Sequence, residues 1–248
     1  MLSQIMIACV IPARFDSSRF PGKLLAIAKG KTILQRTFER AKDCFDSEQI
    51  FIATDNRAIY DHAQQIGAQA IWTSSTCKNG TERIAEAVRN HPRLQQAEIV
   101  VNLQGDHPTT DPHTIQAAVE LLQRDTSSCM STAAAPICCE RDFRSPHIVK
   151  VIIDKDCNAL YFSRSPIPFC ANGLPQNALQ HIGLYCFRRK FLLEFMDLAA
   201  TPLQLLEDLE QLKALENGYR IQVALVNEPA LGVDVPEDLA KLEALLCQ

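Results

Sequence analysis

The sequence predicts an α/β fold, in which a mostly parallel sheet is flanked by helices and carries an inserted β-rich subdomain. Over the first half of the 248 residues, short apolar runs alternate with segments of helical periodicity. Helices of about ten residues between strands provide the crossovers that parallel strands require. Between residues 130 and 190, several strand-like runs follow one another instead. A hydrophobic content of 47% and a charged content of 22% fit a globular chain with a large core.

The first half is expected to contain strands and helices in alternation. Strands are predicted at residues 5–11, 50–53, 70–72 and 98–102. Helices are predicted at residues 32–41, 58–66 and 81–88, where apolar side chains recur at helical spacing. The next helix begins within "DPHTIQAAVELLQ", with Asp111 as N-cap and Pro112 in the first turn, which are preferred residues at these positions.

The second half changes from alternation to a succession of strands. These are predicted at residues 129–137, 148–153, 159–162 and 181–187, and the Pro-rich "SPIPFCANGLPQN" separates the last two. Leucines at helical spacing predict a helix over 203–217, followed by a strand over 219–226 and a helix from Pro236. We expect one domain over residues 1–248, with the inserted subdomain near 130–190.

The charge balance and the hydropathy pattern exclude several classes of protein. A net charge of −4 and a pI of about 5.9 give no bulk attraction for nucleic acid, so no nucleic-acid partner is expected. No apolar run approaches the ~20 residues of a transmembrane helix, and the N-terminus does not resemble a signal peptide. The ten cysteines form no Cys-x-x-Cys motif and are expected to be reduced. A cytoplasmic protein that does not bind membranes is therefore expected.

The loop after the first predicted strand is the first candidate site. Within "IPARFDSSRFPGK", Arg14, Arg19 and Lys23 follow an apolar run directly. In open α/β sheets, ligands collect at the carboxyl ends of the strands. Three cations there fit a polyphosphate, although a solvated basic loop would have the same composition. Neither the Gly-x-Gly-x-x-Gly fingerprint nor a Walker A loop is present, so the cations would bind through their side chains.

Two aspartates form the second candidate site. Asp106 follows the strand at 98–102 in "NLQGDHP", where a carboxylate at the sheet edge suits Mg²⁺ and its shared phosphate ligands. A turn residue beside Gly105 is the alternative. Asp234 in "LGVDVPEDL" either caps the last helix or meets Asp106 on one metal ion. The residues alone leave both alternatives open.

Seven segments together resemble the 3-deoxy-manno-octulosonate (KDO) cytidylyltransferases, also called CMP-KDO synthetases. They occur in the family's order and span nearly the whole chain: "VIPARFDSSRFPGK", "KNGTERIAEAV", "NLQGDHP", "YFSRSPIPF", "HIGLYCFR", "LEDLEQLKALENG" and "GVDVPEDL". The resemblance implies a fold of the nucleotide-diphospho-sugar transferase type. It also implies an enzyme that converts CTP and KDO, a 2-keto-3-deoxy sugar acid, to CMP-KDO and diphosphate for lipopolysaccharide synthesis. Magnesium would be the cofactor, and a homodimer built through the inserted subdomain would be the assembly.

The resemblance also implies a role for each matching position. Nucleotide-binding residues would be Arg14, Arg19, Lys23, Asn79, Gly80, Thr81 and Gln104. Metal ligands would be Asp106 and Asp234, which together with Lys23 would form the catalytic group. The sugar acid would bind to Arg164, His181, Glu210 and Gln211, although the residues alone favour a solvated helix face for the last two and a capped strand end for His181. An arginine suits the carboxylate that adjoins the anomeric carbon of the sugar acid.

Several positions depart from the family's pattern. The family usually has Glu at His107, Ser at Asn79, Thr at Val235 and Arg at Gln180, and several members have Glu at Gln204. These departures leave three alternatives open. The enzyme could act on a related acid such as 8-amino-8-deoxy-KDO, it could use another nucleotide, or the chain could be a non-catalytic nucleotide-binding homologue.

Overall fold

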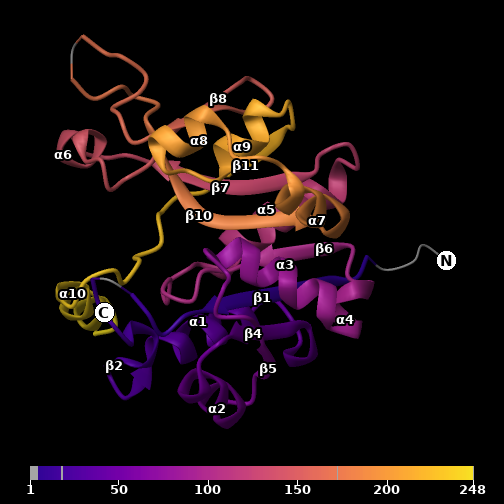
Figure 1. The fold of residues 1–248 in the computed structure, drawn as a ribbon. Coiled ribbons are helices and arrows are strands. Elements are labelled where there is room, and N and C mark those ends of the chain that lie inside the picture. Colours follow the sequence, from indigo (N-terminus) through magenta and orange to yellow (C-terminus); the bar gives the residue numbers. More distant parts are fainter. Residues whose placement is uncertain (1–4, 18, 172, 248) are drawn as a thin grey trace. The chain divides into compact units, whose positions relative to one another are not determined.

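The computed structural model describes residues 5–17, 19–171 and 173–247 (Figure 1). The chain divides into two compact units, which are described separately. The first unit contains residues 1–116 and 230–248, and the second contains residues 117–229. The expected α/β class is confirmed, while the single domain with an insertion near 130–190 stays a prediction.

A parallel sheet forms the centre of the first unit. Its strands lie in the order β6 (Ile99–Asn102), β1 (Ile7–Ala13), β4 (Ile50–Thr54) and β5 (Gln69–Trp72). In register, Cys9 of β1 pairs with Ile50 on one side and Val101 on the other. The chain runs from β1 outward to β4 and β5, and then returns to the opposite side of β1 to form β6. Ligands bind at such a reversal of strand order, which here lies between the ends of β1 and β6.

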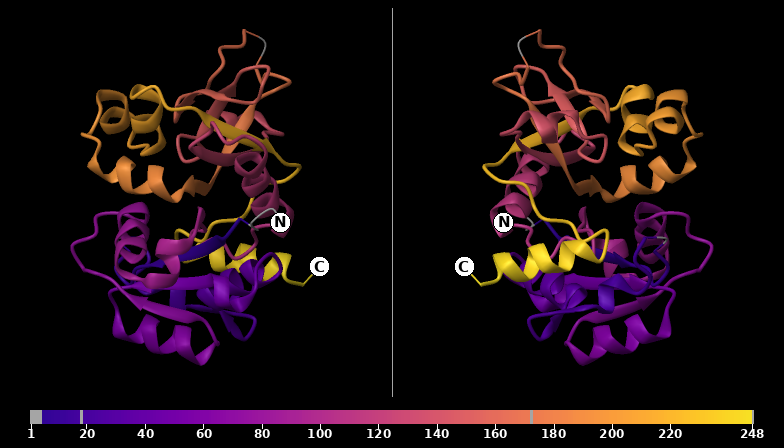
Figure 2. Two further views of the ribbon diagram at one scale, coloured as in Figure 1. Left: turned by 90° about the vertical axis from the view of Figure 1, so that its right-hand side faces the viewer. Right: turned by 90° about the vertical axis from the view of Figure 1, so that its left-hand side faces the viewer.

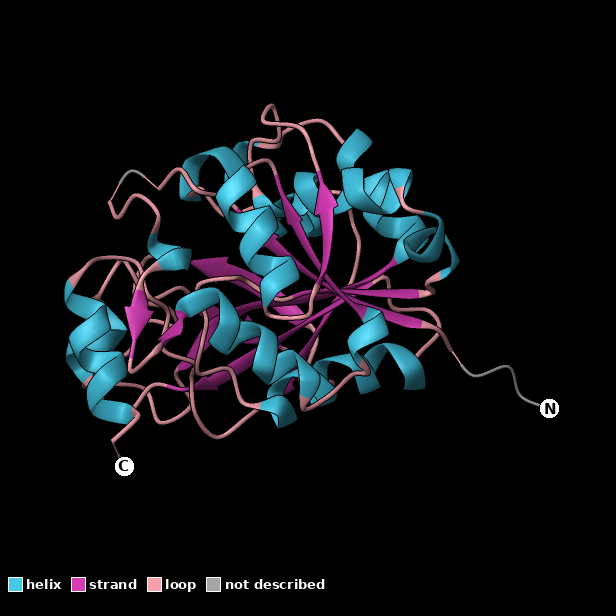
Figure 3. Ribbon diagram, turned by 90° about the horizontal axis from the view of Figure 1, so that it is seen from below, coloured by secondary structure: helices cyan, strands magenta, loops and turns pink. Residues whose placement is uncertain are grey.

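Helices flank the strands, as Figure 3 shows, and local side chains explain where several of them begin. Thr32, Asn56 and Asn79 each accept a backbone N–H from the helix that follows. The helices of the first unit are α1 (Ile33–Lys42), α2 (Arg57–Gln65), α3 (Gly80–Asn90), α4 (Pro92–Gln96) and α10 (Glu237–Leu245). Figure 2 shows α10, in yellow, beside the indigo elements of the same unit, where it contacts the short strand β2 (Ile27–Ala28). The C-terminal segment therefore returns to the N-terminal unit.

Helix α5 (Pro112–Arg124) leads from the first unit into the second. The carboxylate of Asp111 accepts the backbone N–H of His113 at 2.9 Å. This confirms the N-cap that the sequence predicts.

The second unit contains a mixed sheet. Strand β7 (Met130–Pro136) pairs in parallel with β11 (Ile221–Leu225) and antiparallel with β10 (Leu179–Arg188). Strands β8 (Lys150–Ile153) and β9 (Ala159–Ser163) form an antiparallel hairpin, and β8 also pairs with β10. A break in register between Ile182 and Tyr185 interrupts the pairing of β10 with β7. Every strand predicted from the sequence is present, within a few residues at each end.

The helix predicted over residues 203–217 is wrong as one continuous element. The structure has α8 (Pro202–Glu207) and α9 (Gln211–Glu216), separated by residues 208–210, of which Asp208 has φ 52° and ψ 51°. The Glu207 carboxylate accepts hydrogen bonds from the Ser163 hydroxyl and the Arg164 backbone N–H of the neighbouring strand segment. These bonds hold the end of α8 against β9, so the chain turns there instead of continuing as a helix.

The sequence analysis did not predict the helices α4, α6 (Glu140–Arg144) and α7 (Arg189–Asp197). The first two have only five residues each, which is too short for helical periodicity to be evident. Among the helices in the described residues, none combines the length and the apolar content that a membrane span requires.

Candidate active site

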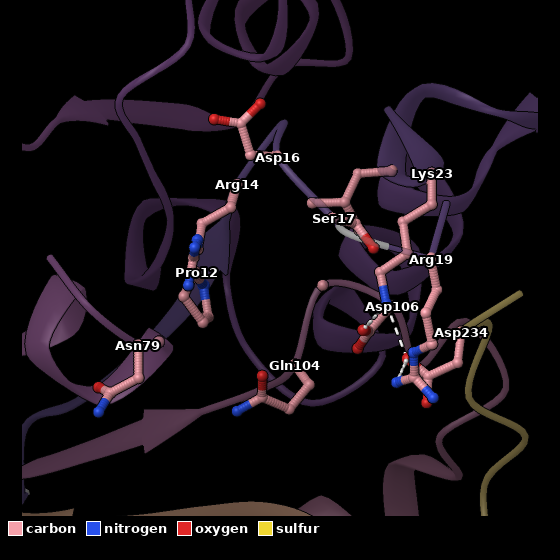
Figure 4. A pocket seen from close by; sticks show the side chains of 13 residues that line it. Pro12, Arg14, Asp16, Ser17, Arg19, Lys23, Asn79, Gln104, Asp106 and Asp234 are labelled. Carbon is pink, nitrogen blue, oxygen red and sulfur yellow. Dashed lines mark hydrogen bonds and ion pairs between the residues drawn. The ribbon is translucent and has the colours of Figure 1, made fainter. Parts of the chain in front are cut away.

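A cavity of about 370 Å³ opens in the first unit, at the carboxyl ends of β1 and β6. Figure 4 shows Arg19, Lys23, Asp106 and Asp234 together at one side, and Asn79 and Gln104 away from this group. The cavity is lined by Pro12, Arg14, Asp16, Ser17, Arg19, Lys23, Leu24, Asn79, Gly80, Gln104, Gly105, Asp106 and Asp234. Of the residues that the sequence assigned to the nucleotide and the metal, all except Thr81 line this one cavity.

The ammonium of Lys23 lies between the two candidate metal ligands. Its Nζ contacts Asp106 Oδ2 and is 3.0 Å from Asp234 Oδ1. Arg19 Nη2 is 3.2 Å from the same Asp234 oxygen. Burial alone would lower the pKa of Lys23, but the charges and hydrogen bonds of Asp106 and Asp234 raise it above its ordinary value. Lys23 is therefore charged at neutral pH.

Asp106 is held as a carboxylate in a partly buried position. Burial would raise its pKa, whereas the charges of His107 and Lys23 and the hydrogen bond from Lys23 lower it below the ordinary value. His107 Nε2 lies 3.9 Å from Asp106 Oδ1. A deprotonated, partly desolvated carboxylate is thereby available to a cation that enters the cavity.

Asp234 does not cap the last helix. Instead, Asp238 in the first turn of α10 accepts the backbone N–H groups of Asp234 and Val235 at 3.0 and 3.1 Å. The start of α10 has no side-chain cap, and the Asp234 carboxylate is directed to Lys23 and Arg19. This excludes the cap as the role of Asp234, while a metal ion shared with Asp106 stays a prediction.

The donor set fits magnesium. Within the described part of the chain, no group of three or more His, Cys, Asp or Glu side chains is placed to hold a metal ion. Asp106 and Asp234 form a pair, and both reach the same Lys23 ammonium, so they are close enough to share one cation. Mg²⁺ is usually held by one or two carboxylates together with substrate phosphates.

Close backbone packing shapes the wall of the cavity. A Cβ atom on Gly80 would lie 3.0 Å from Pro12 Cγ, and one on Gly105 would lie 3.1 Å from the Pro12 carbonyl oxygen. A side chain at either glycine would therefore push the end of β1 away. Arg14, next along this strand end, donates from Nη1 to the Lys78 carbonyl at 2.8 Å. The loop after β1 is thus fixed to the segment that begins α3.

Thr81 lies behind the cavity. It is 1% exposed, and its hydroxyl oxygen accepts a hydrogen bond from Asn102 Nδ2 at 3.2 Å. Asn102 Oδ1 in turn accepts from Gln104 Nε2 at 3.0 Å. The structure therefore connects Thr81 to the cavity through two amide side chains.

In the second unit, three of the four predicted sugar-binding residues surround Tyr185. The His181 ring lies 5.4 Å from the Tyr185 ring, and the Tyr185 hydroxyl donates to Gln211 Oε1 at 3.0 Å. Burial first, and then the charge of Glu210, raises the pKa of Tyr185 well above its ordinary value. Gln211 is 1% exposed, so it does not lie on a solvated helix face.

Arg164 lies at the end of β9 and is fixed by backbone carbonyls. Its Nε donates to the Glu207 carbonyl at 2.8 Å, and Nη1 and Nη2 donate to Pro146 and Asp208 at 3.2 and 3.3 Å. Gln211, by contrast, has an unsatisfied side chain. Its Nε2 is buried and makes no hydrogen bond to any residue that the structure describes. A buried amide without a partner is costly in a native protein, so this N–H group indicates a place for a polar ligand or water.

Comparison with known proteins connects this geometry to a family. The chain matches the model of a family described as cytidylyltransferase over residues 8–221. A 3-deoxy-manno-octulosonate cytidylyltransferase of Protochlamydia amoebophila is 43% identical over 242 residues, covering 96% of this chain and 93% of the relative. The chain belongs to the 3-deoxy-manno-octulosonate cytidylyltransferase family.

Two further matches agree with this family. A member from Thermodesulfovibrio yellowstonii is 44% identical, over 96% of this chain and 97% of the relative. A solved structure of CMP:2-keto-3-deoxy-manno-octonic acid synthetase complexed with CTP has a TM-score of 0.91 and 34% identity, and the match covers 98% of this chain and 99% of the other. The relatives therefore match over almost their full length.

Two of the departures from this cytidylyltransferase family have local structural partners. Asn79 caps α3 by accepting the Glu82 backbone N–H at 2.8 Å, as a serine would. The Gln204 side chain accepts the Thr201 backbone N–H at 3.3 Å and closes a capping box at the start of α8. These two side chains are thus engaged in starting helices.

Sequence reasoning missed two residues that hydrogen-bond to candidate site residues or their neighbours. Asn102 ends the apolar strand "EIVVN", and a polar side chain at such a place is a signal that it has a buried partner. Glu207 precedes the motif that contains Glu210, but its contact with β9 depends on the break in the helix. In this member of the cytidylyltransferase family, the sequence therefore contained a signal for Asn102 but none for Glu207.

Proposed function

We propose that this protein transfers the cytidylyl group of CTP to KDO, giving CMP-KDO and diphosphate. The observation that carries the proposal is the convergence of two carboxylates and three cationic side chains in one cavity, in a chain of this family. A cation cluster alone fits many anions. Paired with two aspartates at the end of a parallel sheet, it fits a magnesium-bound nucleoside triphosphate.

In the proposed reaction, the anomeric 2-hydroxyl of the sugar acid attacks the α-phosphorus of CTP. A new bond forms between that oxygen and phosphorus, and the bond to the bridging oxygen of the β-phosphate breaks. Diphosphate leaves with the electron pair, and the hydroxyl proton passes to solvent. Such transfers depend on positioning and on neutralising charge more than on covalent participation of the protein. Arg14, Arg19 and Lys23 bring three positive charges to the cavity where diphosphate would form.

Asp106 and Asp234 are proposed to hold Mg²⁺. When bound, this ion would neutralise phosphate charge and favour deprotonation of the attacking hydroxyl. The support is the shared approach of both carboxylates to Lys23 and the lowered pKa of Asp106. Lys23 and Arg19 together balance the two negative charges in the structure as it stands.

Arg164, His181, Glu210 and Gln211 are proposed to bind the sugar acid. Three carbonyls orient the Arg164 guanidinium, and each terminal nitrogen retains a second N–H for a carboxylate. The buried Nε2 of Gln211 offers a donor to a sugar hydroxyl. These donors suit a substrate that carries one carboxylate and several hydroxyls.

We further propose a homodimer that forms through the second unit. Phe169 is 91% exposed, and Leu160 and Leu225 are more than half exposed. A second cavity of about 460 Å³, lined largely by apolar side chains such as Val151 and Ile153, lies in the same unit. Exposed apolar groups of this kind are typical of protein–protein contacts. A cytoplasmic location, where CTP is available, and a role in lipopolysaccharide synthesis complete the proposal.

Release of diphosphate tests the activity directly. The purified protein should release it when CTP, Mg²⁺ and KDO are present, and EDTA should abolish release. A panel should contain 8-amino-8-deoxy-KDO, another 2-keto sugar acid, UTP and ATP. Turnover with only one of these alternatives would identify that compound as the substrate in place of KDO or CTP. No turnover with any combination of sugar acid and nucleotide would indicate a non-catalytic homologue.

A further inference from the structure

The side chain of Asn102 links helix α3 to the wall of the cavity. Asn102 is fully buried at the end of β6, with 0% exposure. Its Nδ2 donates to Thr81 Oγ1 at 3.2 Å, and its Oδ1 accepts from Gln104 Nε2 at 3.0 Å. Both hydrogen-bonding ends of this amide are therefore used by neighbours within the first unit. Gln104, in contrast, lines the cavity.

The hydrogen bond with Asn102 determines which end of the Gln104 amide is left for a ligand. Gln104 uses Nε2 for Asn102, so its Oε1 stays available. This oxygen lies 3.6 Å from the Cβ position of Gly80, which also lines the cavity. Turning the amide by 180° would place two carbonyl oxygens against each other. The buried Asn102 oxygen would then lose its hydrogen bond, so this orientation of Gln104 is disfavoured.

We propose that Asn102 is a positioning residue, which fixes Gln104 as a hydrogen-bond acceptor for a donor group of the nucleotide. The inference rests on the proposed CTP-dependent transfer. CTP offers two kinds of donor, the 4-amino group of cytosine and the hydroxyls of ribose. Uracil carries a carbonyl oxygen where cytosine carries the amino group, so an acceptor of fixed orientation would favour CTP over UTP in the first case.

Two substitutions at position 102 separate positioning from packing. Asn102→Asp keeps the shape and presents oxygen to Gln104, so the Gln104 amide keeps its orientation. Asn102→Leu has a similar size but no acceptor, so Gln104 can turn. If instead Asn102 donated its hydrogen bond to Gln104, both the aspartate and the leucine variant would lose the hydrogen bond between positions 102 and 104.

The experiment measures binding and turnover of CTP, UTP and 2′-deoxy-CTP. We expect Asn102→Leu to raise Kd and KM for CTP by about tenfold, the usual worth of one hydrogen bond to a substrate. The KM for KDO should change by less than about twofold, because Asn102 and the proposed KDO residues lie in different units. Asn102→Asp should retain most of the affinity for CTP. The matched control is Asn90→Leu, at an exposed position on α3.

The nucleotide panel identifies the donor. If Gln104 accepts from the cytosine amino group, Asn102→Leu will reduce the preference for CTP over UTP. If it accepts from a ribose hydroxyl, the same variant will reduce the preference for CTP over 2′-deoxy-CTP. A fall in either preference supports the proposal.

Three results would overturn it: an unchanged Kd for CTP in Asn102→Leu, an equal loss in Asn102→Asp, or a lowered melting temperature with both nucleotide preferences intact. Should Asn102→Leu not fold, Asn102→Ala removes the same acceptor with less steric demand and is judged by the same criteria. Calorimetric binding of CTP is independent of turnover. Wild-type protein that binds CTP without releasing diphosphate would contradict the proposed function, while the binding measurements would still test Asn102.

Discussion

At the scale of single residues, the site is organised by opposite charges that meet in a partly buried place. Lys23 reaches both Asp106 and Asp234, and Arg19 reaches Asp234. A partly buried carboxylate next to a fixed ammonium stays ionised, because protonation would leave the ammonium unpaired. The first unit therefore keeps the proposed metal-binding oxygens and the proposed phosphate-binding cations close together.

We expect Asp106→Asn to lower kcat for diphosphate release at least about 100-fold, because the amide is a poor ligand for Mg²⁺. The fold should survive, since the substitution preserves shape. Far-UV circular dichroism checks the fold, and Asp43→Asn serves as a control at an exposed carboxylate of the same unit. Undiminished turnover in Asp106→Asn would contradict its assignment as a metal ligand.

At the scale of secondary-structure elements, the break between α8 and α9 positions the predicted sugar-binding residues. The Glu207 carboxylate accepts from Ser163 and from the Arg164 backbone, and the Glu207 carbonyl accepts from the Arg164 side chain. Burial would raise the pKa of Glu207, but the hydrogen bonds from Ser163 and Arg164 lower it below its ordinary value. The end of α8 thus fixes both the end of β9 and the start of α9, where Glu210 lies.

Glu207→Gln should raise the KM for KDO about tenfold and leave the KM for CTP nearly unchanged, because the amide can no longer accept from both partners. Unfolding in urea should show a loss of about 1–3 kcal/mol at neutral pH. Equal changes in both KM values would contradict the assignment of Glu207 to the sugar-acid side.

The pH dependence of that stability difference follows from the lowered pKa of Glu207. The carboxylate contributes its full stabilisation above the unfolded-state pKa, about 4.3, and loses it as the pH falls through the lower folded-state value. The gap in unfolding free energy between wild type and Glu207→Gln should therefore be constant near neutrality and shrink below about pH 4. A difference in unfolding free energy that grows on acidification would contradict a lowered pKa for Glu207.

Asp208 has a left-handed conformation, with φ 52°. We expect Asp208→Ala to destabilise the protein by about 1 kcal/mol, because alanine tolerates this conformation poorly. Asp208→Gly should be neutral or slightly stabilising, since glycine has no Cβ to clash. Urea midpoints of the two variants make the comparison. Equal destabilisation by both would mean that the aspartate side chain, not the backbone, matters here.

At the scale of the whole molecule, the two units carry different parts of the proposed reaction. The cavity with the cations and aspartates belongs to the first unit, and the group around Tyr185 belongs to the second. The second unit also carries the exposed apolar residues that support a homodimer. Assembly and sugar binding are therefore both assigned to the part of the chain that departs from strict β–α alternation.

We expect light scattering to show a dimer of the wild-type chain and a shift toward monomer in Phe169→Glu. Phe169 is 91% exposed, and a charge at its position would disfavour an apolar contact. Ile27→Glu, at an exposed apolar position of the first unit, is the matched control and should leave the mass unchanged. A stable dimer in Phe169→Glu would exclude this surface as the contact.

The alternation of apolar runs with helical periodicity was sufficient to predict the parallel sheet of the first unit. Strands β1, β4 and β6 are almost entirely buried, and α1, α2 and α3 begin at side-chain caps. The cations after β1 and Asp106 after β6 could also be placed at one edge, because carboxyl ends of parallel strands share an edge. The helix over 203–217 could not be predicted correctly. Its leucine spacing is helical throughout, whereas the break coincides with the contact between Glu207 and β9, which is distant along the chain.

By itself, the sequence determined the α/β class, the family and the chemistry of the candidate residues, because these depend on local pattern and residue type. Only the tertiary structure decided how those residues meet. The Asp234 carboxylate pairs with Lys23 and Arg19 while its backbone N–H bonds to Asp238, and Gln104 presents its oxygen because Asn102 holds its nitrogen. Both outcomes depend on hydrogen bonds whose direction cannot be read from spacing along the chain. Such bonds exist only once the chain has folded and the groups compete for the same partners.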